Sequence, residues 1–152
     1  MRSVTLAAAM ALGLLGAARA ADPASLKPDD VIAGRQAGFD LQQGLATAMK
    51  AAVDGSQPVK PLAAGAKGIA AWARVIPSEF PAGTEAGHDT KAKPEIWSDQ
   101  AGFQKAAANL AQAADKLVTL AEADDKAGFA DQFAEMGKAC GACHKQFRVK
   151  RD

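Results

Sequence analysis

The sequence predicts an all-α domain built as an antiparallel four-helix bundle. The 152-residue chain is rich in Ala, lacks Tyr and has few β-branched residues. After residue 20, four long stretches repeat apolar residues at intervals of three and four, which is the helical period. Short turns separate the first stretch from the second and the third from the fourth, and short turns join helices that run antiparallel.

Residues 1–20 have the features of an export signal. Arg2 gives a positive start, residues 6–16 are apolar, and Ala18-Arg19-Ala20 has the small residues that signal peptidase prefers. A membrane anchor would need about 20 apolar residues, and Arg19 interrupts the run well before that length. We therefore expect cleavage before Ala21, leaving residues 21–152 as a single domain.

The expected mature chain is almost neutral. Loss of Arg2 and Arg19 leaves 16 basic against 17 acidic residues, a net charge of −1. A nucleic-acid-binding protein needs a basic face to neutralise phosphates, so this charge balance argues against that function.

The first helix is expected from Pro28 to about Asp54. Proline suits the first turn of a helix, Asp29 and Asp30 suit its positive end, and Gly55 is a plausible stop. At two positions the helical periodicity does not decide which of two adjacent residues faces inward. The expected inward residues are Ile32, Arg35 or Gln36, Phe39, Gln42, Leu45 or Ala46, and Met49.

The second helix is expected from Pro58 to Ile76, before Pro77. Trp72 should flank its buried stripe, which consists of Leu62, Ala66, Ile69, Ala70 and Ala73. From Pro77 to Pro94, prolines and glycines interrupt a polar segment that has no helical or strand periodicity. A connection of about 17 residues is longer than usual, so it is expected either to be functional or to wrap around a bound group, and the second is favoured.

The third helix is expected from Pro94 to about Ala121 and the fourth from Lys126 to Val149, with an acidic turn at 122–125 between them. The inward residues of the third are Ile96, Trp97, Phe103, Ala107, Leu110, Ala114, Leu117 and Ala121. Those of the fourth are Phe129, Phe133, Met136, Cys140, Cys143, His144 and Phe147.

The only two cysteines lie in Cys140-Gly141-Ala142-Cys143-His144. This Cys-x-x-Cys-His pattern is the attachment signature of c-type haem, in which each thiol adds to a vinyl group and the imidazole binds iron. On a helix, Cys140, Cys143 and His144 share one face, so all three can reach one porphyrin. The bundle is therefore expected to hold one covalent haem as a large part of its core.

Other sites fit the same residues less well. A structural zinc site needs four ligands, and His88 is the only further histidine, in a loop without another cysteine. A redox-active dithiol of the thioredoxin type is expected beside a βαβ pattern, which the sequence lacks. An exported pair of cysteines also suggests a disulfide, but His144 directly after Cys143 favours haem.

With this motif on the last of four helices, the chain resembles the class II c-type cytochromes, and among them the cytochromes c′. In class I cytochromes c the motif lies near the N-terminus. The resemblance covers the whole expected mature chain. It extends to Val31-Ile32-Ala33-Gly34-Arg35-Gln36-Ala37-Gly38-Phe39, to Phe80-Pro81-Ala82-Gly83-Thr84 and to Lys93-Pro94-Glu95-Ile96-Trp97.

The resemblance implies further contacts to the haem. Arg35 is similar to the arginine that pairs with a haem propionate, and Gln36 would lie at the same edge. Thr84 and Glu85 are further candidates for propionate contacts in the 77–94 loop. Arg148, four residues after His144, is expected on the same helix face, on the proximal side of the haem.

The resemblance also places Phe39 over the distal face of the haem. A phenylalanine cannot ligate iron, which implies a five-coordinate, high-spin haem that binds NO or CO in an apolar pocket. His88 is the alternative ligand, because its loop could swing over the haem. Met49 lies about 15 Å along the helix from Phe39, and Met136 shares a helix with His144, so neither is expected to bind iron.

The function implied by this resemblance is that of a periplasmic cytochrome that transfers electrons, binds NO or CO, or does both. Its partners would be these gases, an unidentified redox protein and a second copy bound through the first two helices. The alternatives are a low-spin, six-coordinate electron carrier and a haem peroxidase. A peroxidase would need a distal acid/base group, so we expect no enzymatic activity.

Overall fold

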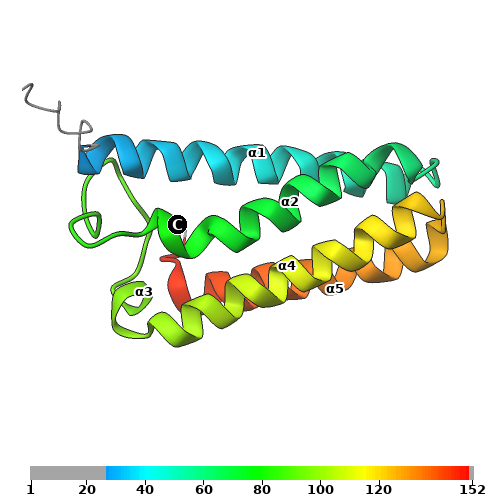
Figure 1. The fold of residues 1–152 in the computed structure, drawn as a ribbon. Coiled ribbons are helices and arrows are strands. Elements are labelled where there is room, and N and C mark those ends of the chain that lie inside the picture. Colours follow the sequence, from blue (N-terminus) through cyan, green and yellow to red (C-terminus); the bar gives the residue numbers. More distant parts are fainter. Residues whose placement is uncertain (1–26, 151–152) are drawn as a thin grey trace, which may run out of the picture.

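A computed structural model describes residues 27–150 as an antiparallel bundle of four long helices, which confirms the predicted fold class (Figure 1). The long helices are α1 (Pro28–Asp54), α2 (Ala63–Val75), α4 (Gln100–Glu122) and α5 (Lys126–Phe147). The connections contain the short helix α3 (Glu95–Ser98) and two 3₁₀ turns, η1 (Lys60–Leu62) and η2 (Ile76–Glu79). The predicted signal peptide and its cleavage before Ala21 lie outside the described residues.

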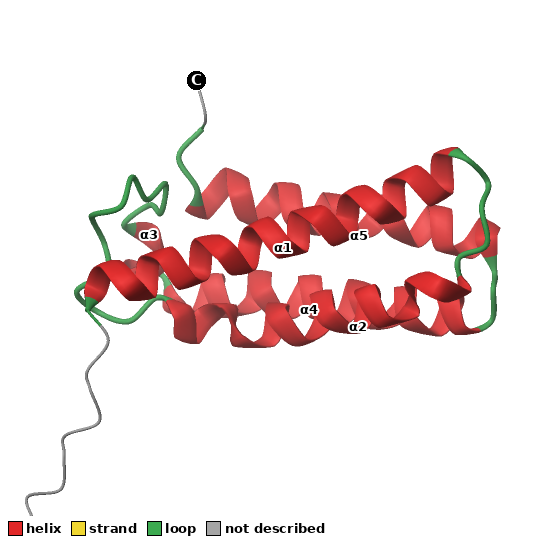
Figure 2. Cartoon of the chain, turned by 90° about the horizontal axis from the view of Figure 1, so that it is seen from above, coloured by secondary structure: helices red, strands yellow, loops and turns green. Residues whose placement is uncertain are grey.

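Helix α4 is the centre of the bundle. It packs most extensively against α2 on one side and α5 on the other, whereas α1 makes fewer contacts, with α2 and α5. All four run along a common axis (Figure 2). Most residues predicted to face inward are buried, and the core consists mainly of Ile32, Met49, Ala66, Ile69, Ala70, Ala73, Ile96, Phe103, Ala107, Leu110, Ala114, Leu117, Ala121, Phe129, Met136 and Phe147.

The structure of α1 shows which residue faces inward at the two positions that the helical periodicity left undecided. Arg35 is buried and Gln36 only half-buried, while Leu45 is exposed and Ala46 half-buried. The arginine therefore lies on the inward face of the helix, although it is charged. This placement requires polar partners from another segment, because a buried charge without hydrogen bonds is very costly.

The predicted third helix is in fact two helices. Asp99 has φ −123° and ψ 62°, which breaks the helix between α3 and α4. Its Oδ1 accepts a hydrogen bond from the Gly102 N–H at 2.9 Å and so caps α4. Asp residues favour this capping position over a helix interior, because the carboxylate satisfies an otherwise free backbone donor. Asp125 caps α5 in the same way, through the Gly128 N–H.

The predicted second helix is shorter than 58–76. Its ends are the 3₁₀ turns η1 and η2, which contain Pro61 and Pro77 respectively. Proline has no backbone N–H and its ring collides with the preceding turn, so the α-helical ladder is confined to the residues between them.

The predicted fourth helix ends at Phe147, two residues early. Arg148 is extended, with φ −125° and ψ 133°. The chain then pairs with the loop before α3: the Val149 N–H donates to the Lys91 carbonyl at 2.8 Å, and the Lys93 N–H donates to the Phe147 carbonyl at 3.0 Å. Arg148 is therefore the residue at which the helix ends: its N–H still donates to the His144 carbonyl, and its own backbone is extended.

In the described part of the chain, no helix combines the length and the apolar character that crossing a membrane requires.

Phe129 provides a test of the core. Its side chain is fully buried, so Phe129→Ala is expected to lower the free energy of unfolding by about 3–5 kcal/mol. Val149→Ala, at a position that is 46% exposed, is the control and should cost less than about 1 kcal/mol. Urea denaturation of the haem-loaded protein measures both. Equal losses in the two variants would contradict the described packing.

Candidate functional site

Cys140 and Cys143 form a pair of half-buried thiols on the last turns of α5. Both are free, and both pack against the hydrophobic core. Burial raises the pKa of each thiol, although the positive charge of Arg148 opposes this rise at Cys143. The two side chains are therefore neutral thiols near pH 7, and their i, i+3 spacing places them on one face of the helix.

His144 follows directly on the same helix. Its side chain is exposed, and its backbone carbonyl accepts a hydrogen bond from the Arg148 N–H at 3.0 Å, which closes the last turn of α5. Cys140 and His144 are four residues apart, so their side chains leave neighbouring turns in similar directions.

Phe39 lies on α1, half-buried within an aromatic cluster. Its ring is 5.6 Å from that of Trp72 on α2 in an edge-to-face arrangement and 6.3 Å from that of Phe80. The Trp72 ring lies so close to Gly38 that a Cβ at this position would collide with it. The cluster continues to α5, because the Phe103 ring lies 5.1 Å from both Phe80 and Phe147.

Arg35 joins α1 to the long loop. Its side chain is 1% exposed. One terminal nitrogen, Nη1, donates to the Glu79 carbonyl at 3.3 Å and to Thr84 Oγ1 at 2.8 Å. The other, Nη2, donates to the Thr84 carbonyl at 2.8 Å and to Thr90 Oγ1 at 3.1 Å. Four acceptors from the loop thus surround one guanidinium group.

The electrostatic environment of Arg35 is unusual for a buried charge. Desolvation lowers the pKa of the guanidinium, and the negative charges of Glu85 and Glu79 oppose that change. The guanidinium carbon also lies 4.2 Å from the centre of the Phe80 ring, within range of a cation–π interaction. Hydrogen bonds, nearby charges and an aromatic face together replace the lost hydration.

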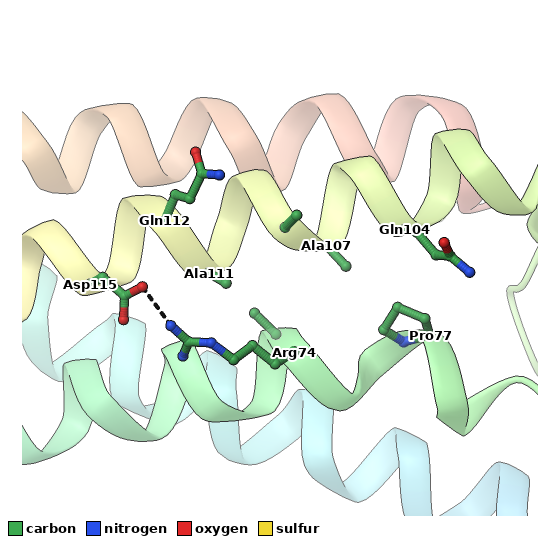
Figure 3. Close-up of a pocket in the computed structure, with 9 residues that line it drawn as sticks. Arg74, Pro77, Gln104, Ala107, Ala111, Gln112 and Asp115 are labelled. Atoms are coloured by element: carbon green, nitrogen blue, oxygen red, sulfur yellow. Dashed lines mark hydrogen bonds and ion pairs between the residues drawn. The ribbon is translucent and has the colours of Figure 1, made fainter.

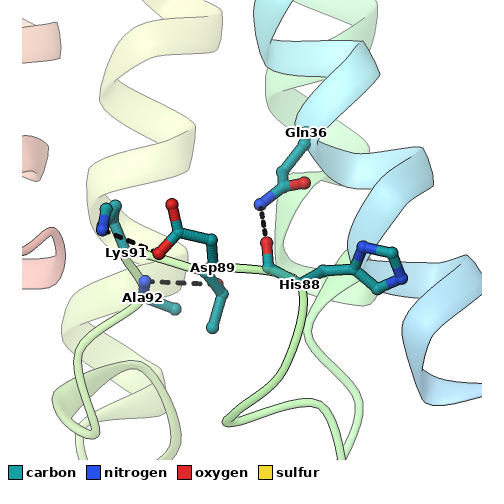
Figure 4. Close-up of polar contacts among 6 residues, drawn as sticks. Gln36, His88, Asp89, Lys91 and Ala92 are labelled. Atoms are coloured by element: carbon teal, nitrogen blue, oxygen red, sulfur yellow. Dashed lines mark hydrogen bonds and ion pairs between the residues drawn. The ribbon is translucent and has the colours of Figure 1, made fainter.

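Gln36 and His88 meet at the outer edge of this loop (Figure 4). The Gln36 side-chain amide donates to the His88 carbonyl at 3.0 Å. The His88 imidazole itself lies 3.9 Å from an Asp29 carboxylate oxygen in the first turn of α1. Asp29 precedes Phe39 by about 15 Å along the helix, so His88 is placed near the start of α1 and not beside Phe39.

Thr84 and Glu85 differ in exposure. Thr84 is 2% exposed, and its hydroxyl donates to the Pro81 carbonyl at 2.8 Å while it accepts from Arg35. Glu85 is exposed, and its carboxylate accepts from the Gly83 N–H at 3.1 Å. Of the two predicted loop residues, Thr84 is part of the Arg35 cluster, and Glu85 stabilises the turn beside it.

The structure therefore brings the predicted site residues together in two groups at one end of the bundle. Arg35, Gln36 and Thr84 meet in the loop, and the thiols, His144 and Arg148 lie at the end of α5. Phe39 belongs to the aromatic cluster. The partners Glu79, Phe80 and Thr90 were missed by the sequence analysis, because no local pattern relates them to Arg35 across 44 to 55 positions.

Gln42, which was predicted to face inward, and Trp72, which was predicted to flank the buried stripe, each carry an unpaired polar atom near Phe39. Gln42 Oε1 and Trp72 Nε1 are buried, and neither has a hydrogen-bond partner among the described residues. Buried polar atoms are usually paired, so such exceptions call for an explanation. Free neutral thiols, half-buried aromatic rings and unpaired polar atoms together fit a large, mainly apolar group with polar edges, which is the chemistry of a haem.

A groove of about 500 Å³ lies elsewhere, between α2 and α4 (Figure 3). Small side chains such as Ala107 and Ala111 line it, and the ion pair between Arg74 and Asp115 lies at one end, at 2.6 Å. None of the predicted site residues lines this groove, so it is separate from the candidate site.

Within residues 27–150, no set of three or more His, Cys, Asp and Glu side chains is placed to hold a metal ion directly.

Comparison with known proteins relates this arrangement to one family. The family model described as cytochrome C′ matches residues 30–148. Cytochrome c′ of Rubrivivax gelatinosus is 36% identical over 126 residues, which cover 82% of this chain and 98% of that protein.

Solved structures agree with this relation. A cytochrome c′ with ligand-controlled dimer dissociation has a TM-score of 0.78 at 29% identity, covering 84% of this chain and all of that one. A nitric oxide complex of a variant of cytochrome c′ from Alcaligenes xylosoxidans has a TM-score of 0.73 at 30% identity. The match covers 82% of this chain and 98% of that one. The same coverage, identity and TM-score hold for a carbon monoxide-bound variant of that protein.

Arg35→Lys tests the loop cluster. Lysine keeps the positive charge but lacks the planar guanidinium group that donates to four acceptors. The free energy of unfolding is therefore expected to fall by about 2 kcal/mol. Arg74→Lys is the matched control, because the Arg74–Asp115 pair is about half exposed on both sides and should be worth less than about 1 kcal/mol. Thermal and urea denaturation measure both. If the two variants behaved alike, the Arg35 cluster would not stabilise the loop.

Proposed function

Because the chain belongs to the cytochrome c′ family, we propose that its haem is attached through Cys140 and Cys143, with His144 as the axial ligand of the iron. Cytochromes c′ carry one covalently attached haem c, and this chain is a c-type cytochrome of that class. When bound, the haem supplies an iron centre that changes oxidation state and binds small ligands. The proposal assigns its attachment to the only two cysteines of the chain.

The position of the thiols supports this assignment. Each thiol would hold the haem by a carbon–sulfur bond to a vinyl group, with the thiol proton passing to the other vinyl carbon. Cys140 and Cys143 are both free, and His144 lies one residue further along the same helix. A single α-helix thus holds the three groups at a fixed spacing.

The proposed haem is five-coordinate, and Phe39 is the observation that carries this part of the proposal. A low-spin carrier needs a second side chain with a lone pair on the iron, and phenylalanine has none. Met136 is buried on the same helix as His144, whereas His88 lies at the start of α1 beside Asp29. Neither position favours ligation opposite His144.

The proposed activity is reversible binding of NO or CO, together with electron transfer, and not catalysis. Related cytochromes c′ have been crystallised with nitric oxide and with carbon monoxide. A peroxidase would need an acid/base group beside the iron, whereas the rings that contact Phe39 are those of Trp72 and Phe80. Trp72 Nε1 and Gln42 lie near this aromatic group, so the proposed pocket is apolar with polar atoms at its margin.

Residues 1–20 are proposed to direct the chain to the periplasm and to be removed before Ala21. The apolar run at 6–16 followed by Ala18-Arg19-Ala20 supports this proposal. Export also suits the chemistry of attachment, because the thiols must reach haem in the compartment where c-type cytochromes mature.

A homodimer through α1 and α2 is proposed from two exposed stripes of small and apolar residues. Leu41, which is 73% exposed, and Leu45 are the large members of the α1 stripe. Such residues at helical spacing favour a packed seam between helices. The α1 stripe consists of Ala33, Ala37, Leu41, Gly44, Leu45 and Ala48, and the α2 stripe of Ala64, Gly68, Ala71 and Val75.

The optical and EPR spectra of the haem-loaded protein test the function. High-spin spectra that change on addition of CO and NO are expected for the native chain. Phe39→Met should introduce a sulfur ligand, convert the spectra toward low spin and weaken CO binding at least tenfold. Phe133→Met, on α5, is the control and should leave the spin state unchanged. A native protein that is low-spin and whose spectra do not change on addition of CO would refute the open coordination site. That result would support a dedicated electron carrier.

The dimer has its own test. Leu41→Lys places a charge in the proposed seam and is expected to shift sedimentation from dimer to monomer. Val149→Lys changes a residue that is 46% exposed and lies outside both stripes, so it should leave the oligomeric state unchanged. A native protein that sediments as a monomer at all concentrations would exclude this interface.

A further inference from the structure

A basic patch forms where the end of the chain meets the loop before α3. It consists of Lys91, Lys93, Lys145, Arg148 and Lys150. In the sequence these residues form two separate groups about 50 positions apart. Neither 91–93 nor 145–150 contains an acidic residue.

Backbone pairing holds the two groups together. Ala92 and Arg148 form an antiparallel bridge, flanked by the hydrogen bonds from Val149 N–H to the Lys91 carbonyl and from Lys93 N–H to the Phe147 carbonyl. In addition, Lys93 Nζ donates to the Lys145 carbonyl at 3.0 Å. The two basic segments are therefore held side by side at this end of the bundle.

Most of this positive charge is not neutralised within the described chain. Asp89 pairs with Lys91 at 3.0 Å, with the aspartate side chain 90% exposed. The carboxylate of Asp99 borders the patch, where it accepts from the Gln146 amide at 3.0 Å. Lys93, Lys145, Arg148 and Lys150 form no ion pair with a described acidic residue, although the expected mature protein carries a net charge of only −1.

The patch lies at the attachment end of α5. The Arg148 N–H donates to the His144 carbonyl at 3.0 Å, and Lys145 directly follows His144. A surface beside the proposed iron ligand offers a short path for an electron. A concentrated charge of one sign also increases the rate at which an oppositely charged molecule meets that surface.

We propose that this basic patch docks a negatively charged electron-transfer protein, which donates one electron to the oxidised haem or accepts one from the reduced haem. The proposal rests on the haem attachment proposed above. One electron leaves one centre and reaches the other, and no bond is formed or broken. The partner is defined by its acidic docking face, which the four cations without ion pairs would complement.

The experiment follows the second-order rate at which the reduced haem-loaded protein is oxidised by hexacyanoferrate(III), an anion, as ionic strength rises. For the native chain this rate should fall steeply with salt, because salt screens attraction between charges more than about 10 Å apart. Lys145→Glu/Lys150→Glu should slow the reaction about tenfold at low salt and flatten its salt dependence. With a cationic cobalt(III) oxidant, the same variant should react faster than the native chain.

The matched control, Lys60→Glu/Lys116→Glu, makes the same change in net charge away from the patch. Its rates with both oxidants should stay within about twofold of native. Poly-L-glutamate, a model of an acidic protein face, should slow native oxidation and have less effect on the patch variant. If the patch variant matched the control, the docking surface would be refuted while the haem function stood. If neither oxidant reacted with the native protein, electron transfer itself would be refuted, and the docking surface with it.

Discussion

The buried guanidinium group of Arg35 constrains this end of the bundle. A charge removed from water requires several hydrogen bonds, and α1 cannot provide them because its own carbonyls are used within the helix. Glu79, Thr84 and Thr90 supply the acceptors, so the long connection after α2 must fold back over α1. The loop is thereby ordered without a regular secondary structure of its own. Loss of any one acceptor would leave part of a buried cation unpaired, which is more costly than never having buried it.

The ordered loop in turn determines the end of the chain. Once residues 79–90 are held by Arg35, residues 91–93 lie beside the last turn of α5 and pair with its extended tail. This pairing accompanies the end of the helix at Phe147, after which the backbone of Arg148 is extended. It also brings the two basic segments side by side. The interaction that fixes the loop thus also shapes the surface proposed to meet a redox partner.

Small residues define the rest of the architecture. Alanines at the contacts of α2 and α4 let these helices approach closely, which makes α4 the centre of the bundle. On the outward faces of α1 and α2, small residues leave apolar stripes available to a second copy. Helix α1 has fewer contacts with its neighbours than α4 does, and Gln42 and Trp72 carry unpaired buried atoms near Phe39. These features agree with a fold in which the haem contributes part of the packing between helices.

The sequence by itself determined the fold class, the four long helices and the haem motif, because each depends on spacing within a few residues. Apolar residues three and four apart define a helix face, and Cys140, Cys143 and His144 share one face by the same rule. Their roles in haem binding remain predictions, as do those of Gln36, Phe39, Thr84 and Glu85. Only the tertiary structure decided that Arg35 is buried under the loop, that Asp99 divides a predicted helix and that α5 ends at Phe147. These outcomes depend on contacts between residues far apart in the sequence, where no local period relates a side chain to its partner.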